Sequence, residues 1–216
     1  MQLSNIENAT FYMTYVLLLT TGTITLIEAI ATKNPQIRHI MNLETCISIV
    51  AAYFYSRFIK MINESKGGVD AMKFTLIRYN DWVITTPLML LSLILVLSFN
   101  KTPVHFGVFV VVLLANFGML ACGYLGETGV LTRTLACLLG FVFFVIVFGV
   151  IWYYVVKRYN INVFAFYVFV IIWSMYGFAY LADDRVKNVA FNVLDMFAKC
   201  LVGIFFWLYF TKVLKL

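Results

Sequence analysis

The sequence predicts an all-α membrane protein, a seven-transmembrane-helix bundle that forms a single domain over residues 1–216. Hydrophobic residues make up 63% of the chain and charged residues only 12%, whereas a soluble domain carries about 25% charged residues. The apolar residues also fall into runs that can cross a bilayer core of about 30 Å, which takes roughly 20 residues of helix. The seven runs are 8–31, 36–62, 72–97, 103–123, 130–156, 161–181 and 187–212.

Polar and helix-breaking residues separate these runs. Asn34-Pro35 ends the first run, and residues 63–70 combine a glycine pair with charged side chains. Glycine and proline are the residues that most strongly mark turns between helices. The remaining breaks are Asn100 to Pro103, Gly126 to Gly129, Lys157-Arg158 and Asp183-Asp184-Arg185.

The charges between the runs predict an orientation in the membrane. Seven spans place the two termini on opposite sides. The connections 32–38, 98–103 and 157–160 and the C-terminal tail carry lysine and arginine without Asp or Glu. Basic residues gather in cytoplasmic loops, so we expect an extracellular N-terminus and a cytoplasmic C-terminus.

The composition also argues against several other classes of protein. The net charge of +6 fits basic cytoplasmic loops, and no basic stripe with interleaved aromatic residues predicts nucleic-acid binding. The cysteines lie inside apolar runs without a CxxC spacing, so we interpret them as small buried side chains rather than as disulfides or metal ligands. They are Cys46, Cys122, Cys137 and Cys200. We expect no metal site and no enzyme activity.

Five ionisable residues lie deep inside the predicted spans: Glu44, Arg78, Asp81, Asp195 and Lys199. Charges are costly in a bilayer, so each of them is a hypothesis of function. Asp195 and Lys199 are four residues apart and share one face of the seventh helix. Arg78 and Asp81 are three residues apart and share a face of the third helix.

The lysine is the residue of this group that indicates a specific chemistry. A buried lysine tends to lose its proton and to become a nucleophile, which suits a Schiff base. A protonated Schiff base on Lys199 would need counterions, and Asp81 and Asp195 are available. A purely structural salt-bridge cluster between the third and seventh helices is the alternative interpretation of the same spacing.

Three segments resemble motifs of the microbial rhodopsins. Residues 78–87, RYNDWVITTP, are similar to the third-helix motif R-Y-x-D-W-x-x-T-T-P. Residues 194–199, LDMFAK, resemble the seventh-helix motif L-D-x-x-A-K, and residues 173–176, WSMY, resemble the sixth-helix motif W-S-x-Y. The resemblance spans nearly the whole chain, with looser matches in helices 1, 4 and 5.

This resemblance implies a cofactor, all-trans retinal, bound as a Schiff base to Lys199. Asp81 would be the primary counterion and proton acceptor, Asp195 would be the second counterion, and Arg78 would lie on the extracellular side of Asp81. Tyr55 would be bonded to the helix 7 aspartate. The residues expected around the retinal are Trp82, Thr86, Met89, Met119, Gly123, Trp173, Tyr176 and Tyr180, with Tyr55 near them.

The chain departs from the family pattern at several positions. Gly177 stands where a proline follows the helix 6 tyrosine, and Tyr180 stands in place of a pocket tryptophan. Helix 5 has Ala136 and Cys137 where tryptophans are usual. Lys187 occupies the position of a frequent proton-release glutamate, which argues against a fast release group.

The helix 3 positions of acceptor, neighbour and cytoplasmic donor are Asp81, Thr85 and Ser92. This D-T-S triad in a short chain is similar to the rhodopsins of giant viruses of marine protists. The similarity implies a membrane of an infected host cell. Family members form trimers or pentamers, so we expect a homo-oligomer in the lipid bilayer.

We expect a light-driven outward proton pump, in which the usual donor carboxylate is missing. Ser92 cannot supply a proton at any useful pH. By helix rise, Glu44 lies roughly 12 Å and Ser92 roughly 9 Å from the cytoplasmic side, so the two could face each other. We interpret Glu44 as the donor and Ser92 as its hydrogen-bond partner. Pairing of Glu44 with Arg38, or a helix-capping role, stays open.

A light-gated cation channel is the alternative function. Thr86 and Asn116 would form a polar link between helices 3 and 4 near the retinal, where channels keep a gate. In a pump the same pair would only tie the two helices. No transducer is predicted, because the chain stops shortly after the last span. The polar line that a channel needs through helices 1, 2, 3 and 7 is thin: Glu28, Glu44, Ser48, Asn192, Asp81 and Asp195.

Overall fold

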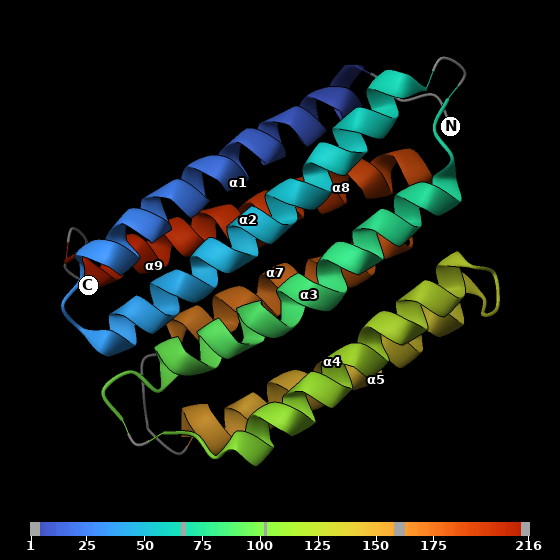
Figure 1. Cartoon of the computed structure of the whole chain (residues 1–216). Coiled ribbons are helices and arrows are strands. Elements are labelled where there is room, and N and C mark those ends of the chain that lie inside the picture. Colours follow the sequence, from blue (N-terminus) through green and yellow to red (C-terminus); the bar gives the residue numbers. More distant parts are fainter. Residues whose placement is uncertain (1–4, 66–67, 102, 158–162, 213–216) are drawn as a thin grey trace.

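The computed structural model describes residues 5–65, 68–101, 103–157 and 163–212, and this part of the chain forms seven helical rods in one bundle (Figure 1). The predicted fold class is therefore confirmed. The first four rods are α1 (Asn5–Ala31), α2 (Pro35–Glu64), α3 (Ala71–Leu97) and α4 (Phe106–Glu127). The other three are α5 (Arg133–Ile151) continued by η1 (Trp152–Val156), then α7 (Phe164–Tyr180), and α8 (Asp184–Asp195) continued by η2 (Met196–Leu201) and α9 (Val202–Phe210).

The rods run alternately up and down the bundle. In Figure 1, α1 begins at the end of the bundle opposite to the end at which α9 stops. We call these the first end, where α1 begins, and the second end, where α1 stops. The pair α1 and α2 packs on one side and the pair α4 and α5 on the other, while α3 and α7 lie between them.

Local sequence explains where two of the helices begin. The Oδ1 atom of Asn34 accepts hydrogen bonds from the backbone N–H groups of Gln36 and Ile37, at 2.9 and 3.4 Å. Pro35 then takes the first position of α2, where a missing N–H costs nothing. Asp70 caps α3 in the same way, by accepting from the backbone of Met72 at 2.9 Å.

The rods differ from the predicted runs by a few residues at their ends, and the fourth and seventh rods are examples. The fourth helix begins at Phe106 rather than at residue 103, because His105 caps it by accepting from the N–H of Gly107 at 3.1 Å. It continues to Glu127, beyond the predicted end at 123. The seventh rod begins at Asp184 rather than at 187, so Asp184 forms part of the first helical turn. Residues 161–162 of the sixth predicted run, and Arg158 of the predicted break before it, lie outside the described residues.

The outer surface of the bundle is suited to lipid. By length and composition, 6 of the described helices can cross a membrane, and the shorter apolar helix Phe164–Tyr180 accompanies them. Large apolar side chains such as Ile30 and Phe106 point outward and are mostly exposed. Cys46 is also exposed, which corrects the expectation that all cysteines are buried, whereas Cys200 is buried.

The seventh rod contains an irregularity at its centre. Residues Met196–Leu201 form the π-helical turn η2, which holds Lys199. Single π-helical turns inside α-helices are frequent at functional sites. The sequence did not predict this turn.

Candidate functional site

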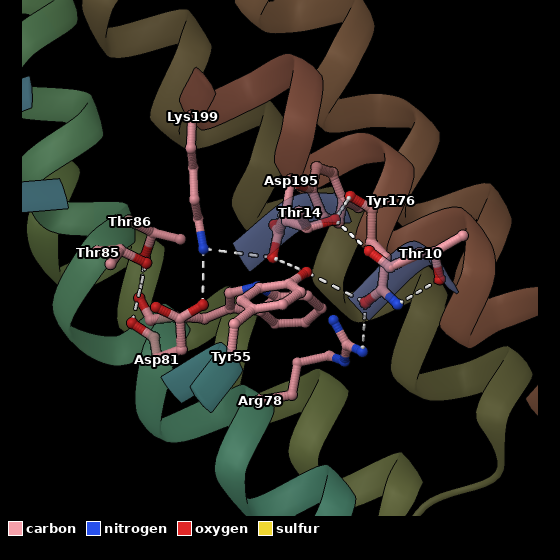
Figure 2. Close-up of polar contacts among 12 residues, drawn as sticks. Thr10, Thr14, Tyr55, Arg78, Asp81, Thr85, Thr86, Tyr176, Asp195 and Lys199 are labelled. Carbon is pink, nitrogen blue, oxygen red and sulfur yellow. Dashed lines mark hydrogen bonds and ion pairs between the residues drawn. The ribbon is translucent and has the colours of Figure 1, made fainter. Parts of the chain in front are cut away.

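The site is centred on Lys199, in the middle of the bundle. Only 1% of this residue is exposed. Its Nζ atom lies 2.6 Å from Oδ2 of Asp81 on α3 and 3.4 Å from Oδ2 of Asp195 at the end of α8 (Figure 2). The lysine and the two aspartates that the sequence singled out are thus brought together.

Asp81 has few partners besides the lysine. Its Oδ1 atom is buried and has no hydrogen-bond partner in the described structure. The hydroxyl of Thr85 donates to the backbone carbonyl of Asp81, at 2.9 Å, rather than to the carboxylate. Thr86 in the same way donates to the carbonyl of Trp82, at 2.7 Å. One carboxylate oxygen of Asp81 is therefore free to accept a proton or a water molecule.

Asp195 is held much more firmly. The hydroxyl of Tyr55 on α2 donates to Oδ2 at 2.9 Å, and the hydroxyl of Tyr176 on α7 donates to Oδ1 at 2.6 Å. Both hydroxyls lie beside Asp195 in Figure 2. Hydrogen bonds to a carboxylate are about twice as strong as bonds between neutral groups, so these two bonds stabilise the charged form of Asp195.

Arg78 lies on the side of Asp81 towards the first end of the bundle. Its Nη2 atom donates to Oδ1 of Asn192 at 3.0 Å, and its guanidinium lies 5.0 Å from the ring centre of Phe58 and 5.4 Å from that of Phe191. No carboxylate oxygen lies within 4.0 Å of it in the described part of the chain. The ion-pair cluster therefore consists of the lysine and the two aspartates, without the arginine.

A cavity with mainly apolar walls opens next to Lys199. It reaches between α3, α4, α5 and α7. Its walls include nearly all the residues expected around the retinal: Trp82, Thr86, Met89, Met119, Gly123, Trp173, Tyr176, Tyr180 and Lys199. Tyr55 is the exception, because it bonds to Asp195 without lining this cavity. Other wall residues were not singled out from the sequence: Leu120, Gly140, Phe141, Phe144 and Phe191.

The departures from the family pattern shape the far part of this cavity. Phe141 of α5 lies where a side chain at position 177 would be, since a Cβ atom on Gly177 would come within 2.5 Å of its ring. Ala136 and Cys137 line the wall in place of tryptophans. Tyr180 donates to the carbonyl of Gly123 at 3.0 Å. Phenylalanine rings of α5 thus replace the bulk that helix 5 tryptophans would supply.

The walls fit retinal. A long apolar polyene suits an apolar, aromatic cavity with few polar groups. Among the described residues of its wall, the amine of Lys199 is the only basic group, and the aspartate pair beside it can balance a positive charge. A salt-bridge cluster that only joined α3 to α8 and η2 would not require such a cavity beside the lysine.

Two further polar contacts lie beyond this centre. Asn116 on α4 donates to the hydroxyl of Thr86 on α3 at 2.8 Å, which is the expected link between the two helices. Towards the second end, the hydroxyl of Ser92 donates to Oε1 of Glu44 at 2.6 Å. Glu44 and Ser92 therefore face each other as their expected depths in the membrane suggested, and both are buried.

Lys187 belongs to an ion-pair cluster at the first end of the bundle. Its Nζ atom lies 2.8 Å from both carboxylate oxygens of Glu127 and 3.1 Å from Oδ1 of Asp184. Arg133 pairs with Asp184 at 2.7 Å. The sequence did not predict that Glu127 would be the partner of Lys187, because the two residues come from different helices.

Comparison with known proteins decides the family. The model of the family described as bacteriorhodopsin-like protein matches residues 5–213. This chain belongs to the bacteriorhodopsin-like family. Members of the family bind retinal as a Schiff base on a lysine, and this rhodopsin carries all-trans retinal on Lys199.

Individual relatives resemble this rhodopsin to different degrees. The crystal structure of the viral rhodopsin OLPVRII is 43% identical, with a TM-score of 0.89 over 98% of this chain and 100% of that one. The light-driven proton pump CsR of Coccomyxa subellipsoidea shares the fold at 19% identity, with a TM-score of 0.76 over 96% and 98% of the two chains. The green-light absorbing proteorhodopsin of Gamma-proteobacterium EBAC31A08 is 28% identical over 62% of this chain, and the match spans 60% of that protein.

Proposed function

We propose that this rhodopsin is a light-driven outward proton pump in which Asp81 accepts the proton from the Nζ atom of Lys199. The observation that carries the proposal is the 2.6 Å distance from Nζ to Oδ2 of Asp81, together with the partnerless Oδ1 atom of the same carboxylate. Retinal, joined as a Schiff base, would supply the light absorption, and the Nζ atom of Lys199 would be the nitrogen that bears the proton.

The two aspartates differ in how easily they can take up this proton. Protonation of Asp195 would weaken two hydrogen bonds, from Tyr55 and Tyr176, that favour its charged form. Each hydrogen bond to a charged group is worth about 1.5–3 kcal/mol. Asp81 would give up only its contact with Lys199, which loses its charge in the same step. We therefore assign Asp81 as acceptor and Asp195 as permanent counterion.

Glu44 is the group that we assign to resupply the proton. Its carboxyl group is buried beside Ser92 on the opposite side of the lysine from Arg78. The alternative partner, Arg38, donates instead to the backbone carbonyl of Thr32 at 2.8 Å. Glu44 also lies in the body of α2, away from its capping residue Asn34. These contacts favour a donor role over a structural one.

The positions of Asp81 and Glu44 on opposite sides of Lys199 also suit one direction of proton transport. We keep the orientation expected from the loop charges, with the first end of the bundle outside and the second end in the cytoplasm. Asp81 and Arg78 then lie on the outer side of Lys199, and Glu44 lies on the inner side. A proton that leaves towards Asp81 and is replaced from Glu44 moves outward.

A light-gated cation channel is the second candidate function. The observation that favours it is the 2.8 Å bond between Asn116 and Thr86 in the wall beside the lysine, where a gate would act. The packing of the cytoplasmic half of the bundle argues against a channel. There Leu90, Leu93 and Phe206 belong to one apolar cluster that would have to open before a hydrated cation could pass.

The similarity to a viral rhodopsin supports the expected location in a membrane of an infected host cell. OLPVRII is described as a viral rhodopsin and is 43% identical to this chain. We accordingly propose that the protein works in a membrane of an infected host cell, as a homo-oligomer of three or five copies.

The direct test of the donor is Glu44→Gln in cells that are supplied with all-trans retinal. Illumination should acidify the medium of cells that make the unchanged protein, and a protonophore should abolish the change. In Glu44→Gln, transfer to Asp81 should stay fast and reprotonation of Nζ should slow by at least about tenfold, as loss of a proton donor predicts. Unchanged reprotonation would refute the donor assignment.

A further inference from the structure

The proposed donor and the lysine are separated by a gap that one hydrogen bond cannot bridge. Glu44 is bonded to Ser92, and Ser92 follows Asp81 by eleven residues on the same helix. That separation corresponds to roughly 16 Å along the axis of α3. Because Nζ of Lys199 is bonded to Asp81, a proton from Glu44 has to cross most of this length.

The side of the gap that faces α3 and α7 is apolar. Met89, Leu90 and Leu93 fill it from α3, and all three are buried in one cluster with Trp173 and Phe206. These side chains provide no hydroxyl or carboxylate that could bind water along the way. The indole Nε1 of Trp173, buried without a hydrogen-bond partner in the described structure, is the one nitrogen or oxygen among these five side chains. A proton route along this side would have one N–H donor, and no hydroxyl or carboxylate, to hold water along it.

The side that faces α1 and α2 is polar. Thr21 on α1 and Ser48 on α2 are both 0% exposed, and the hydroxyl oxygen of each has no hydrogen-bond partner in the part of the chain that the structure describes. Nearby, the hydroxyls of Thr25 and Thr45 contact each other at 2.9 Å. Buried polar atoms in native proteins almost always have a partner, and ordered water supplies it where protein does not.

The positions of these hydroxyls connect the donor to the lysine. Ser48 is four residues after Glu44, so it lies one turn further along the same face of α2. At Gly203 on α9, a Cβ atom would come within 3.0 Å of Cγ2 of Thr21 and 3.2 Å of Oε2 of Glu44. Thr21 and Glu44 therefore converge on one point of α9. Gly203 is four residues after Lys199.

A second glycine brings α1 and α2 together at the same level. A Cβ atom on Gly22 would lie 3.3 Å from Cβ of Ser48. The hydroxyls of Thr21 and Ser48 thus lie in the junction of α1, α2 and the seventh rod.

We propose that Thr21 and Ser48 hold the water that carries the proton from Glu44 to Nζ of Lys199, along α1, α2 and α9 rather than along α3. The proposal rests on the donor role of Glu44. The O–H bond of the carboxyl group breaks as the N–H bond on Nζ forms. Each intervening water or hydroxyl passes on one proton and takes up another, so it ends unchanged. Glu44 regains its proton from the cytoplasmic side.

The test uses the full-length protein with retinal and two variants that remove one hydroxyl each, Thr21→Val and Ser48→Ala. Time-resolved absorbance should show reprotonation of Nζ slowed by about tenfold or more, comparable to the loss of at least one hydrogen bond in the rate-limiting step. Proton transfer to Asp81 should be unchanged. Infrared difference spectra should show a shift of the Glu44 carboxyl C=O band and the loss of a water O–H band.

Two controls separate the route from general damage. Thr23→Val makes the same change on the exposed face of α1, where the hydroxyl donates to the carbonyl of Leu19 at 2.8 Å, and should leave rates and bands unchanged. Thr21→Ser keeps the hydroxyl and should restore the rate.

The outcomes distinguish this route from the donor assignment itself. If Glu44→Gln slows reprotonation while Thr21→Val and Ser48→Ala leave both the rate and the infrared bands unchanged, the donor stands and the route is wrong. If Glu44→Gln also has no effect, donor and route both fail. Slowing in all three variants, with rescue by Thr21→Ser, supports the route.

Discussion

The hydrogen bond between Ser92 and Glu44 sets how readily the proposed donor releases its proton. The Ser92 hydroxyl donates to Oε1 of Glu44 at 2.6 Å. A donated hydrogen bond contributes about 1 kcal/mol to a neutral acceptor and about 2 kcal/mol to a charged one. The bond therefore stabilises the carboxylate that forms during proton release by about 1 kcal/mol more than it stabilises the protonated donor.

Ser92→Ala should remove this difference. A barrier that rises by about 1 kcal/mol slows a step by about fivefold. We expect reprotonation of Lys199 Nζ to slow by this factor in Ser92→Ala, whereas Glu44→Gln should slow it more strongly. The rates are measured by time-resolved absorbance after a short flash on the purified, retinal-loaded protein.

A matched control lies at the C-terminal cap of the same helix. Ser98 is also buried, but its hydroxyl donates to the backbone carbonyl of Ile94 at 2.7 Å and does not contact Glu44. Ser98→Ala should leave the rate of reprotonation unchanged. The reasoning is refuted if Ser92→Ala reprotonates as fast as the unchanged protein, or faster, while it retains its colour.

Three further results are expected. Asp81→Asn should keep its retinal but lose outward transport by more than about tenfold, measured as light-induced acidification, since the acceptor 2.6 Å from the lysine is gone. Glu127→Gln leaves the Lys187 ammonium with Asp184, at 3.1 Å, as its remaining partner, so the loss of stability should stay below the roughly 3 kcal/mol of an unpaired buried charge. Thermal bleaching should occur at a lower temperature, and an unchanged temperature would contradict the buried pair. Asn116→Ala should lower stability by about 1 kcal/mol without a passive leak, and a leak current in patch-clamp recordings would favour the gate.

Much of the fold could be predicted from the sequence, because a bilayer imposes a simple requirement of length and apolarity. The ends of the rods were less predictable. His105 starts α4 at Phe106 through a side-chain cap, and Asp184 joins the first turn of α8 although its charge suggested a loop. Hydropathy detects the apolar centre of a span but not the polar residues that extend it by a turn.

The site could be predicted where residues on one helix determine each other's position. Asp195 and Lys199 share a face by spacing alone. The resemblance to the rhodopsin motifs then predicted most of the residues that line the cavity. Contacts that depend on rotation between helices were harder. Phe191 could have been inferred, because it is four residues before Asp195 on the same face. Residue spacing along the chain does not indicate the π-helical turn around Lys199 or the packing of Phe141 against Gly177.

The pairing of Glu44 with Ser92 is an intermediate case. Counting residues from the ends of two antiparallel helices placed the two side chains at similar depths, and the structure brings them to 2.6 Å. The contacts of Arg78 were harder to predict from the sequence. Its partner, Asn192, lies on α8, and the aromatic rings Phe11, Phe58 and Phe191 around the guanidinium come from α1, α2 and α8.

The central claim is that light drives protons outward through this rhodopsin, and photocurrents recorded at several voltages and external pH values test it most directly. Our account predicts an outward current that persists when the membrane potential and all ion gradients are set to zero, and that disappears in Asp81→Asn. A current that reverses near the equilibrium potential of an ion would contradict the account, because it would identify a passive channel.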